Sequence, residues 1–124
     1  MYALIIDDSR AMRRILGRIV EPLGFSILEG EHGQEGLEQL SLHADEIEVV
    51  LVDWNMPVMN GLEFVKAVRA DESYRDKKLM MVTTETEPAQ MARALMAGVD
   101  EFVMKPFTPE ILIEKMQLIG VSMN

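Results

Sequence analysis

Short apolar runs alternate with longer amphipathic segments along the chain. Short apolar runs, several of them rich in β-branched side chains, are typical of buried strands in a parallel sheet. Such runs occupy residues 2–6, 25–29, 49–52, 79–82 and 102–104. We therefore expect five strands, each separated from the next by a segment long enough to hold a helix.

The segments between and after these runs carry apolar residues at helical spacing, three or four positions apart. Residues 36–43 show a weaker pattern of the same kind, and the polar stretch 71–78 is of loop length. The periodic positions are Met12, Ile15, Leu16, Ile19, Val20 and Leu23, then Leu62, Val65 and Val68, then Met91, Ala94 and Leu95, and finally Ile111, Leu112 and Leu118. Five helices are expected.

A repeated strand–helix alternation indicates an α/β fold. Each return to a parallel strand needs a crossover connection, and the crossover helices cover both faces of the sheet. No Pro/Gly-rich linker, internal repeat or low-complexity tract interrupts the 124 residues. We expect one domain over residues 1–124 and no separate output domain.

Composition and charge narrow the functional classes. The 48% hydrophobic and 27% charged residues are typical of a globular domain, and no apolar run approaches the roughly 20 residues that span a bilayer. The absence of cysteine excludes thiol chemistry and fits the cytoplasm. A net charge of −9 disfavours nucleic acid and anionic membranes as partners and favours cations or basic protein surfaces.

Acidic residues directly follow two of the predicted strands. Asp7 and Asp8 follow residues 2–6, and Asp53 follows residues 49–52. In an open α/β sheet, ligands bind beyond the carboxyl ends of the strands, so these three carboxylates are expected to share a pocket. Clustered hard oxygen ligands without His or Cys favour Mg²⁺.

Two further strand ends carry groups that complement a metal-bound anion. Thr83 follows residues 79–82, and Lys105 follows residues 102–104. A hydroxyl and an ammonium beside a metal suit the oxygens of a phosphoryl group. Because a carboxylate can be the nucleophile of phosphoryl transfer, the pattern predicts an aspartyl phosphate on Asp53.

Each of these residues also has a purely structural interpretation. Asp8 or Ser9 can cap the first helix, and Thr86 can cap the helix around Met91. Lys105 can be an ordinary solvated lysine. We favour function because the five pocket residues follow four different strands at the same edge of the sheet, which capping does not require.

The remaining charged residues are interpreted as surface. The cluster Arg10, Arg13, Arg14 and Arg18 on the first helix can dock an acidic partner, but a solvated helix face explains it more simply. The two histidines lack metal-ligand spacing.

Four sequence blocks resemble the signature blocks of bacterial response-regulator receiver domains, and most closely the single-domain chemotaxis type. They are residues 4–8 (LIIDD), 53–61 (DWNMPVMNG), 81–83 (MVT) and 105–107 (KPF). The resemblance covers essentially the whole chain. It implies a flavodoxin-like fold with strand order 2-1-3-4-5.

The resemblance also implies a metal site and a phosphoacceptor. Asp53 is the implied phosphoacceptor. Asp8, Asp53 and the main-chain carbonyl of Asn55 are the implied Mg²⁺ ligands, and Asp7 is implied to hold a metal-bound water.

Further implied roles concern the switch. Lys105 is implied to pair with the phosphoryl group, and Thr83 to bond one of its oxygens while the ring of Phe102 turns inward. A cis peptide bond is implied at Lys105–Pro106.

Several positions depart from the chemotaxis pattern or refine it. Phe102 stands where tyrosine is common, and Thr84 stands where alanine or glycine is usual, so its bulk is expected to narrow access to the phosphoryl group. Asn55 and Glu85 match receivers that lose their phosphoryl group rapidly, and we expect a short-lived state. Asn60 replaces an aspartate and is expected to alter only a turn.

The same resemblance suggests partners. A histidine kinase is the implied phosphodonor, and a motor switch or another effector is the implied target. The expected output face comprises Met91, Leu95, Phe102, Met104 and Lys115. Chemotaxis is the favoured pathway, while a phosphorelay intermediate or another stand-alone receiver remains open.

Two other functions are weighed against this one. A Mg²⁺-dependent phosphohydrolase typically has a second aspartate two residues after its nucleophile as general acid and base, and Asn55 stands there instead. We therefore expect a chain that is not an enzyme apart from its own phosphorylation and dephosphorylation. A scaffold that has lost phosphorylation is disfavoured because all five pocket residues are present.

Overall fold

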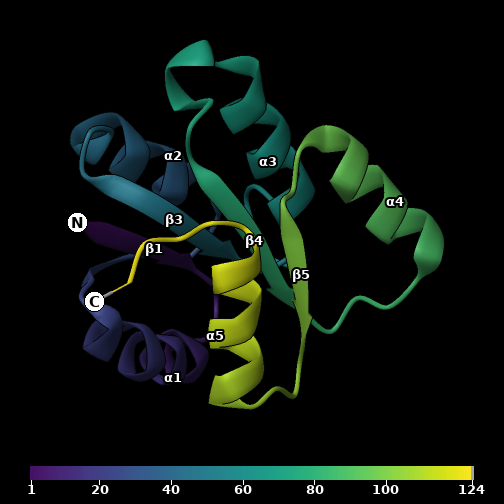
Figure 1. Ribbon diagram of the computed structural model, residues 1–124. Helices are drawn as coiled ribbons and strands as arrows, with labels where there is room; N and C mark the ends of the chain where they lie inside the picture. Colours follow the sequence, from purple (N-terminus) through teal and green to yellow (C-terminus); the bar gives the residue numbers. More distant parts are fainter. Residues whose placement is uncertain (124) are drawn as a thin grey trace.

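The computed structural model describes residues 1–123 and shows a five-stranded parallel sheet in the order β2-β1-β3-β4-β5 (Figure 1). Every neighbouring pair of strands is parallel. The strands are β1 (Tyr2–Ile6), β2 (Ser26–Gly30), β3 (Ile47–Val52), β4 (Lys78–Thr83) and β5 (Glu101–Met104). The predicted fold class and strand order are confirmed.

Helices cover both faces of the sheet (Figure 1). One face packs against α1 (Arg10–Val20) and α5 (Pro109–Leu118). The other packs against α2 (Gly33–His43), α3 (Gly61–Ala70) and α4 (Pro88–Ala97). Within residues 1–123, none of the helices has both the length and the apolar character needed to cross a membrane.

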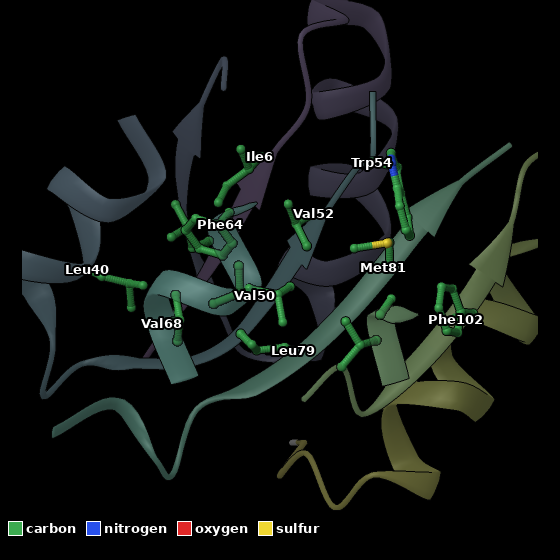
Figure 2. Packing of buried hydrophobic residues seen from close by; sticks show 14 of the residues in the cluster. Ile6, Leu40, Val50, Val52, Trp54, Phe64, Val68, Leu79, Met81 and Phe102 are labelled. Atoms are coloured by element: carbon green, nitrogen blue, oxygen red, sulfur yellow. The ribbon is translucent and has the colours of Figure 1, made fainter. Parts of the chain in front are cut away.

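Alternation along the strands divides the core into two clusters. Leu4 and Ile6 of β1 belong to the cluster under α2, α3 and α4, whereas Ala3 and Ile5 belong to the cluster under α1 and α5. Successive side chains of a strand point to opposite faces, so a strand buried on both faces must be apolar at every position. Figure 2 shows the first cluster, in which the fully buried Phe64 packs near Ile6.

Several element ends differ from those expected. The weak helix begins at Gly33 because His32 caps it, its Nδ1 accepting from the Glu35 amide at 3.3 Å. Residues 21–23 form a separate 3-10 helix in place of the end of the first helix. The stretch 71–78 is only partly loop, since Glu72–Tyr74 form another 3-10 helix.

The two capping expectations have opposite outcomes. Ser9 is the N-cap of α1, and its hydroxyl accepts from the amide of Met12 at 3.2 Å. The expectation for Thr86 is wrong. Glu87 occupies the N-cap of α4 without a side-chain hydrogen bond, because Pro88 begins the helix one position after it.

The half-buried side chain of Arg69 connects α3 to the sheet through several hydrogen bonds. Its guanidinium donates to the carbonyl oxygens of Gly98 at 3.0 Å and Lys77 at 2.9 Å, and to Asp100 Oδ2 at 3.0 Å. The same Asp100 oxygen accepts from the amide of Leu79 at 2.8 Å. Arg69 therefore links α3 to main-chain carbonyls in the turn after α4 and in the loop before β4.

We expect Arg69→Met to lower the free energy of unfolding by about 2 kcal/mol, because it leaves these carbonyls and Asp100 without their charged donor. Urea denaturation followed by circular dichroism measures the change. The matched control is Arg75→Met, which removes an exposed pair with Glu72 and is expected to cost less than about 1 kcal/mol. Equal costs for the two variants would contradict the assigned role of Arg69.

Candidate functional site

Three carboxylates meet at the carboxyl edge of the sheet. Ile6 of β1 pairs with Val52 of β3, so the residues that follow them lie side by side. The Asp53 amide donates to the carbonyl of Ile6 at 3.0 Å. One carboxylate oxygen from each of Asp7, Asp8 and Asp53 lies within 4.8 Å of the others. The structure thus brings together the three acids that the sequence placed at strand ends.

Lys105 reaches into this cluster from the end of β5. Its ammonium lies 2.8 Å from Asp7 Oδ2 and 3.3 Å from Asp53 Oδ2. The Lys105 amide donates to the carbonyl of Thr83 at 2.9 Å, which ties the ends of β4 and β5 together. The peptide bond between Lys105 and Pro106 is cis, as expected from the resemblance.

The carboxylates change the acidity of Lys105. Burial lowers the pKa of its ammonium, but the hydrogen bond to Asp7 and the charges of Asp53 and Asp7 outweigh it, so the pKa lies above its ordinary value of 10.5. A group whose pKa is raised by folding stabilises the folded state below its unfolded pKa. That stabilisation is lost as the pH rises through the folded pKa.

We therefore expect the stability difference between wild type and Lys105→Met, without divalent cations, to be constant at neutral pH and to shrink above about pH 10.5. Urea denaturation at a series of pH values up to about 12 measures it. Lys66→Met is the control, because Lys66 is exposed and forms no ion pair within residues 1–123. A difference that grows with pH would contradict the ion pairs.

The acidic cluster fits a hard divalent cation. Asp7 is buried at 1% exposure, whereas Asp8 is exposed, and its carboxylate accepts no hydrogen bond from residues 1–123. Asn55 is exposed on the loop that follows Asp53. Carboxylate and carbonyl oxygens are the ligands that Mg²⁺ prefers, and its retained waters need an open side such as the one at Asp8.

The loop between β3 and α3 holds Asp53 rigidly. The amide of Trp54 donates to Asp53 Oδ1 at 2.7 Å, which leaves Oδ2 toward Lys105. The amide of Gly61 donates to the carbonyl of Trp54 at 2.8 Å, so the loop closes next to Asp53. Asn60 is the N-cap of α3 and forms a capping box with Glu63, which gives the asparagine a definite structural role.

Val58 in this loop is strained. Its φ of 67° lies in the left-handed region, where a β-branched residue is an outlier, and its side chain is 78% exposed. Packing of this exposed side chain offers little compensation, and the main-chain hydrogen bond that spans Val58 runs from the Met59 amide to the Pro57 carbonyl at 2.7 Å.

We expect Val58→Asn to raise the free energy of unfolding by about 1 kcal/mol, since asparagine tolerates this conformation. Thermal and urea denaturation measure the gain. Val58→Ala serves as control because it keeps the Cβ atom and most of the strain. If alanine stabilises as much as asparagine, strain at Val58 is not the cause.

Thr83 is the last residue of β4, and Thr84 and Glu85 follow it. Thr83 is fully buried, and its Oγ1 accepts from the Glu85 amide at 3.2 Å. Thr84 is exposed and Glu85 half-buried. The short phosphoryl lifetime expected from Asn55 and Glu85, and the narrowing expected from Thr84, stay predictions.

Phe102 is already turned inward. Its ring is 6% exposed and belongs to the same cluster as Trp54 and Met81, its partner in β4 (Figure 2). The expected output face includes Phe102, but a buried ring presents no surface there. Tyrosine, which is common at this position, has a hydroxyl that water can hydrate. Phenylalanine has none and therefore favours the buried position.

The other residues of the expected output face differ in exposure. Leu95 is 52% exposed, while Met91 and Met104 are half-buried. Lys115 is half-buried and lies 3.6 Å from Glu101 Oε1, so its charge is already paired. Leu95 and its exposed neighbour Met96 therefore form most of the apolar surface of α4.

Arg13 corrects the interpretation of the first helix as a solvated arginine face. Arg10, Arg14 and Arg18 are exposed, but Arg13 is 8% exposed and shares the buried stripe of α1 with Leu16 and Val20. Its place at helical spacing from these apolar residues was the signal that could have revealed it.

Comparisons with known proteins agree with this geometry. The family described as the response regulator receiver domain matches residues 3–117. The chemotaxis protein CheY1 of Helicobacter pylori is 46% identical over 120 residues, which cover 96% of each chain. The chemotaxis protein CheY homolog of Campylobacter jejuni is 48% identical over 118 residues, covering 94% of this chain and 90% of that protein.

Solved structures show the same likeness. The chain matches the chemotaxis protein CheY4 of Vibrio cholerae with a TM-score of 0.87 and 33% identity, over 95% of this chain and 97% of that one.

Proposed function

Because the chain belongs to the response regulator receiver family, we propose that it is a switch that is phosphorylated on Asp53 and signals by binding a protein partner. The observation that carries this proposal is the meeting of Asp53 with Asp7, Asp8 and Lys105 at one sheet edge. Mg²⁺ is part of the proposal, held by Asp8, Asp53 and the carbonyl of Asn55. When bound, it supplies positive charge toward the phosphoryl oxygens.

The chain's own residues supply the nucleophile and its orientation. An Asp53 carboxylate oxygen attacks phosphorus and forms an acyl phosphate, while the bond from phosphorus to the donor breaks and the donor keeps its electron pair. The Trp54 amide holds Oδ1, so Oδ2 is the attacking atom. Lys105, which lies 3.3 Å from that oxygen, then pairs with the added negative charge.

A histidine kinase is the proposed donor, and chemotaxis is the proposed pathway. The names of the relatives support the pathway, since the proteins at 46% and 48% identity are chemotaxis proteins. We propose a cytoplasmic location. We also propose that each chain takes up one phosphoryl group as a switch and does not turn over other substrates as an enzyme. A motor protein or another effector is the proposed target. The alternative is a phosphorelay intermediate, which stable capture of the phosphorylated form by a phosphotransfer domain would favour.

The test is intact-protein mass spectrometry after incubation with acetyl phosphate, with and without Mg²⁺. We expect the gain of one phosphoryl group only with Mg²⁺, together with release of one acetate, and peptide mapping should place the group on Asp53. No gain under either condition, with Mg²⁺ binding shown separately by calorimetry, would refute the proposed chemistry and favour the scaffold function.

A further inference from the structure

Arg13 makes two direct contacts at the edge of the acidic site. Its Nη1 donates to the main-chain carbonyl oxygen of Asp7 at 2.6 Å, and its Nε donates to Glu29 Oε1 at 2.8 Å. The first bond is buried, and the second crosses from α1 to the end of β2. The buried Arg13 therefore binds the main chain of Asp7, and Glu29 on the neighbouring strand β2 orients the guanidinium.

The bond to the Asp7 carbonyl also fixes the backbone of Asp8. A peptide unit is planar, so the carbonyl oxygen of Asp7 and the nitrogen and Cα atom of Asp8 move together. The side chain of Asp8 has no such support of its own, because its carboxylate accepts no hydrogen bond from residues 1–123. The direction in which Asp8 points therefore depends on the orientation of this peptide plane.

Other contacts hold different atoms of Asp7. Its amide donates to Gly30, its Oδ1 accepts from the Ser9 amide at 2.9 Å, and its Oδ2 accepts from Lys105. Within the described chain, Arg13 is the side chain that holds the Asp7 carbonyl.

We propose that Arg13 is a positioning residue for the divalent cation, which sets Mg²⁺ affinity by orienting the Asp7–Asp8 peptide plane. This inference rests on the proposed function, because it requires that the acidic cluster binds Mg²⁺. Removal of a group that orients a metal ligand typically weakens metal binding about 10- to 100-fold.

Electrostatics alone predicts the opposite sign. A cationic guanidinium near the three carboxylates repels a divalent cation, so deletion of its charge without any positioning effect strengthens Mg²⁺ binding. The sign of the change in Mg²⁺ affinity therefore separates positioning from simple charge. A purely structural role of Arg13 can be distinguished too. Loss of packing alone lowers the free energy of unfolding but does not change the Mg²⁺ affinity of the folded protein.

The experiment compares Arg13→Met with Arg14→Met by isothermal titration calorimetry with MgCl₂ and by Trp54 fluorescence. Arg14 is the matched control, since it is the exposed neighbour and forms no ion pair within residues 1–123. We expect Arg13→Met to weaken Mg²⁺ binding about tenfold or more. Arg14→Met is expected to leave it unchanged or slightly strengthened.

Arg13→Lys keeps the experiment decisive if Arg13→Met does not fold. Lysine keeps the charge but has no planar fork, so it cannot hold both Asp7 and Glu29 in the same geometry, and a weakening of a few-fold is expected. If folded Arg13→Met binds Mg²⁺ as tightly as wild type or more tightly, the positioning role is overturned but the proposed function is not. If only Arg13→Lys folds, the same result in that variant overturns the positioning role. Absence of Mg²⁺ binding in wild type would overturn the proposed metal site as well.

Discussion

Asp53→Asn is expected to abolish phosphorylation by acetyl phosphate. An amide has no anionic oxygen to attack phosphorus, so the phosphorylated fraction should fall at least about a hundredfold below wild type. The asparagine Oδ1 can still accept from the Trp54 amide, which holds the wild-type side chain at 2.7 Å, so the loop should keep its conformation. Intact-protein mass in the presence of Mg²⁺ measures the loss.

The control for this variant is Asp45→Asn, an exposed acid outside the site that carries the same change of charge. It should be phosphorylated like wild type. Circular dichroism and urea denaturation of Asp53→Asn should show a folded protein, so that loss of phosphorylation cannot be attributed to unfolding. A phosphoryl group found on another residue of Asp53→Asn at wild-type yield would show that Asp53 is not the acceptor.

Gly61→Ala is expected to destabilise the fold by more than about 3 kcal/mol. A Cβ atom on Gly61 would overlap the carbonyl oxygen of Asp53 and would lie 3.0 Å from the Cα atom of Trp54. These neighbours are main-chain atoms that cannot rotate away as a side chain can. Relief of the overlap requires the loop after β3 to move, and Asp53 would move with it.

Urea denaturation measures the stability of Gly61→Ala, and acetyl phosphate labelling of any folded fraction should be slower than in wild type. Gly17→Ala is the matched control. Its added Cβ would lie 3.9 Å from Ile27, an ordinary contact, and alanine in a helix interior is favoured over glycine by up to about 1 kcal/mol. A Gly61→Ala protein as stable as wild type would mean that the loop is more adaptable than its backbone contacts indicate.

The strands and the acidic site could be predicted from the sequence because both depend on local order along the chain. A parallel strand buried on both faces is apolar throughout, and the polar residue that ends it emerges at the sheet edge where the other strands also end. Asp7, Asp53, Thr83 and Lys105 all follow such runs. Their convergence therefore required only the strand order, which came from the resemblance.

Helix beginnings were less predictable because caps depend on geometry at single residues. His32 and Ser9 each accept a main-chain hydrogen bond at a helix start, whereas Thr86 does not. All three residue types can accept such a bond, so composition cannot distinguish them.

Taken by itself, the sequence determined the fold class, the residues at the strand ends and the chemistry that those residues can perform, because periodicity and strand-end position are local properties. Only the tertiary structure decided which charges are buried and paired. Arg13 meets Asp7 and Glu29, and Arg69 meets Asp100 across 31 positions of sequence. It also decided that the ring of Phe102 lies in the core and not on the expected output face. These outcomes depend on which elements pack together, and a local pattern does not name the partners that a side chain will meet.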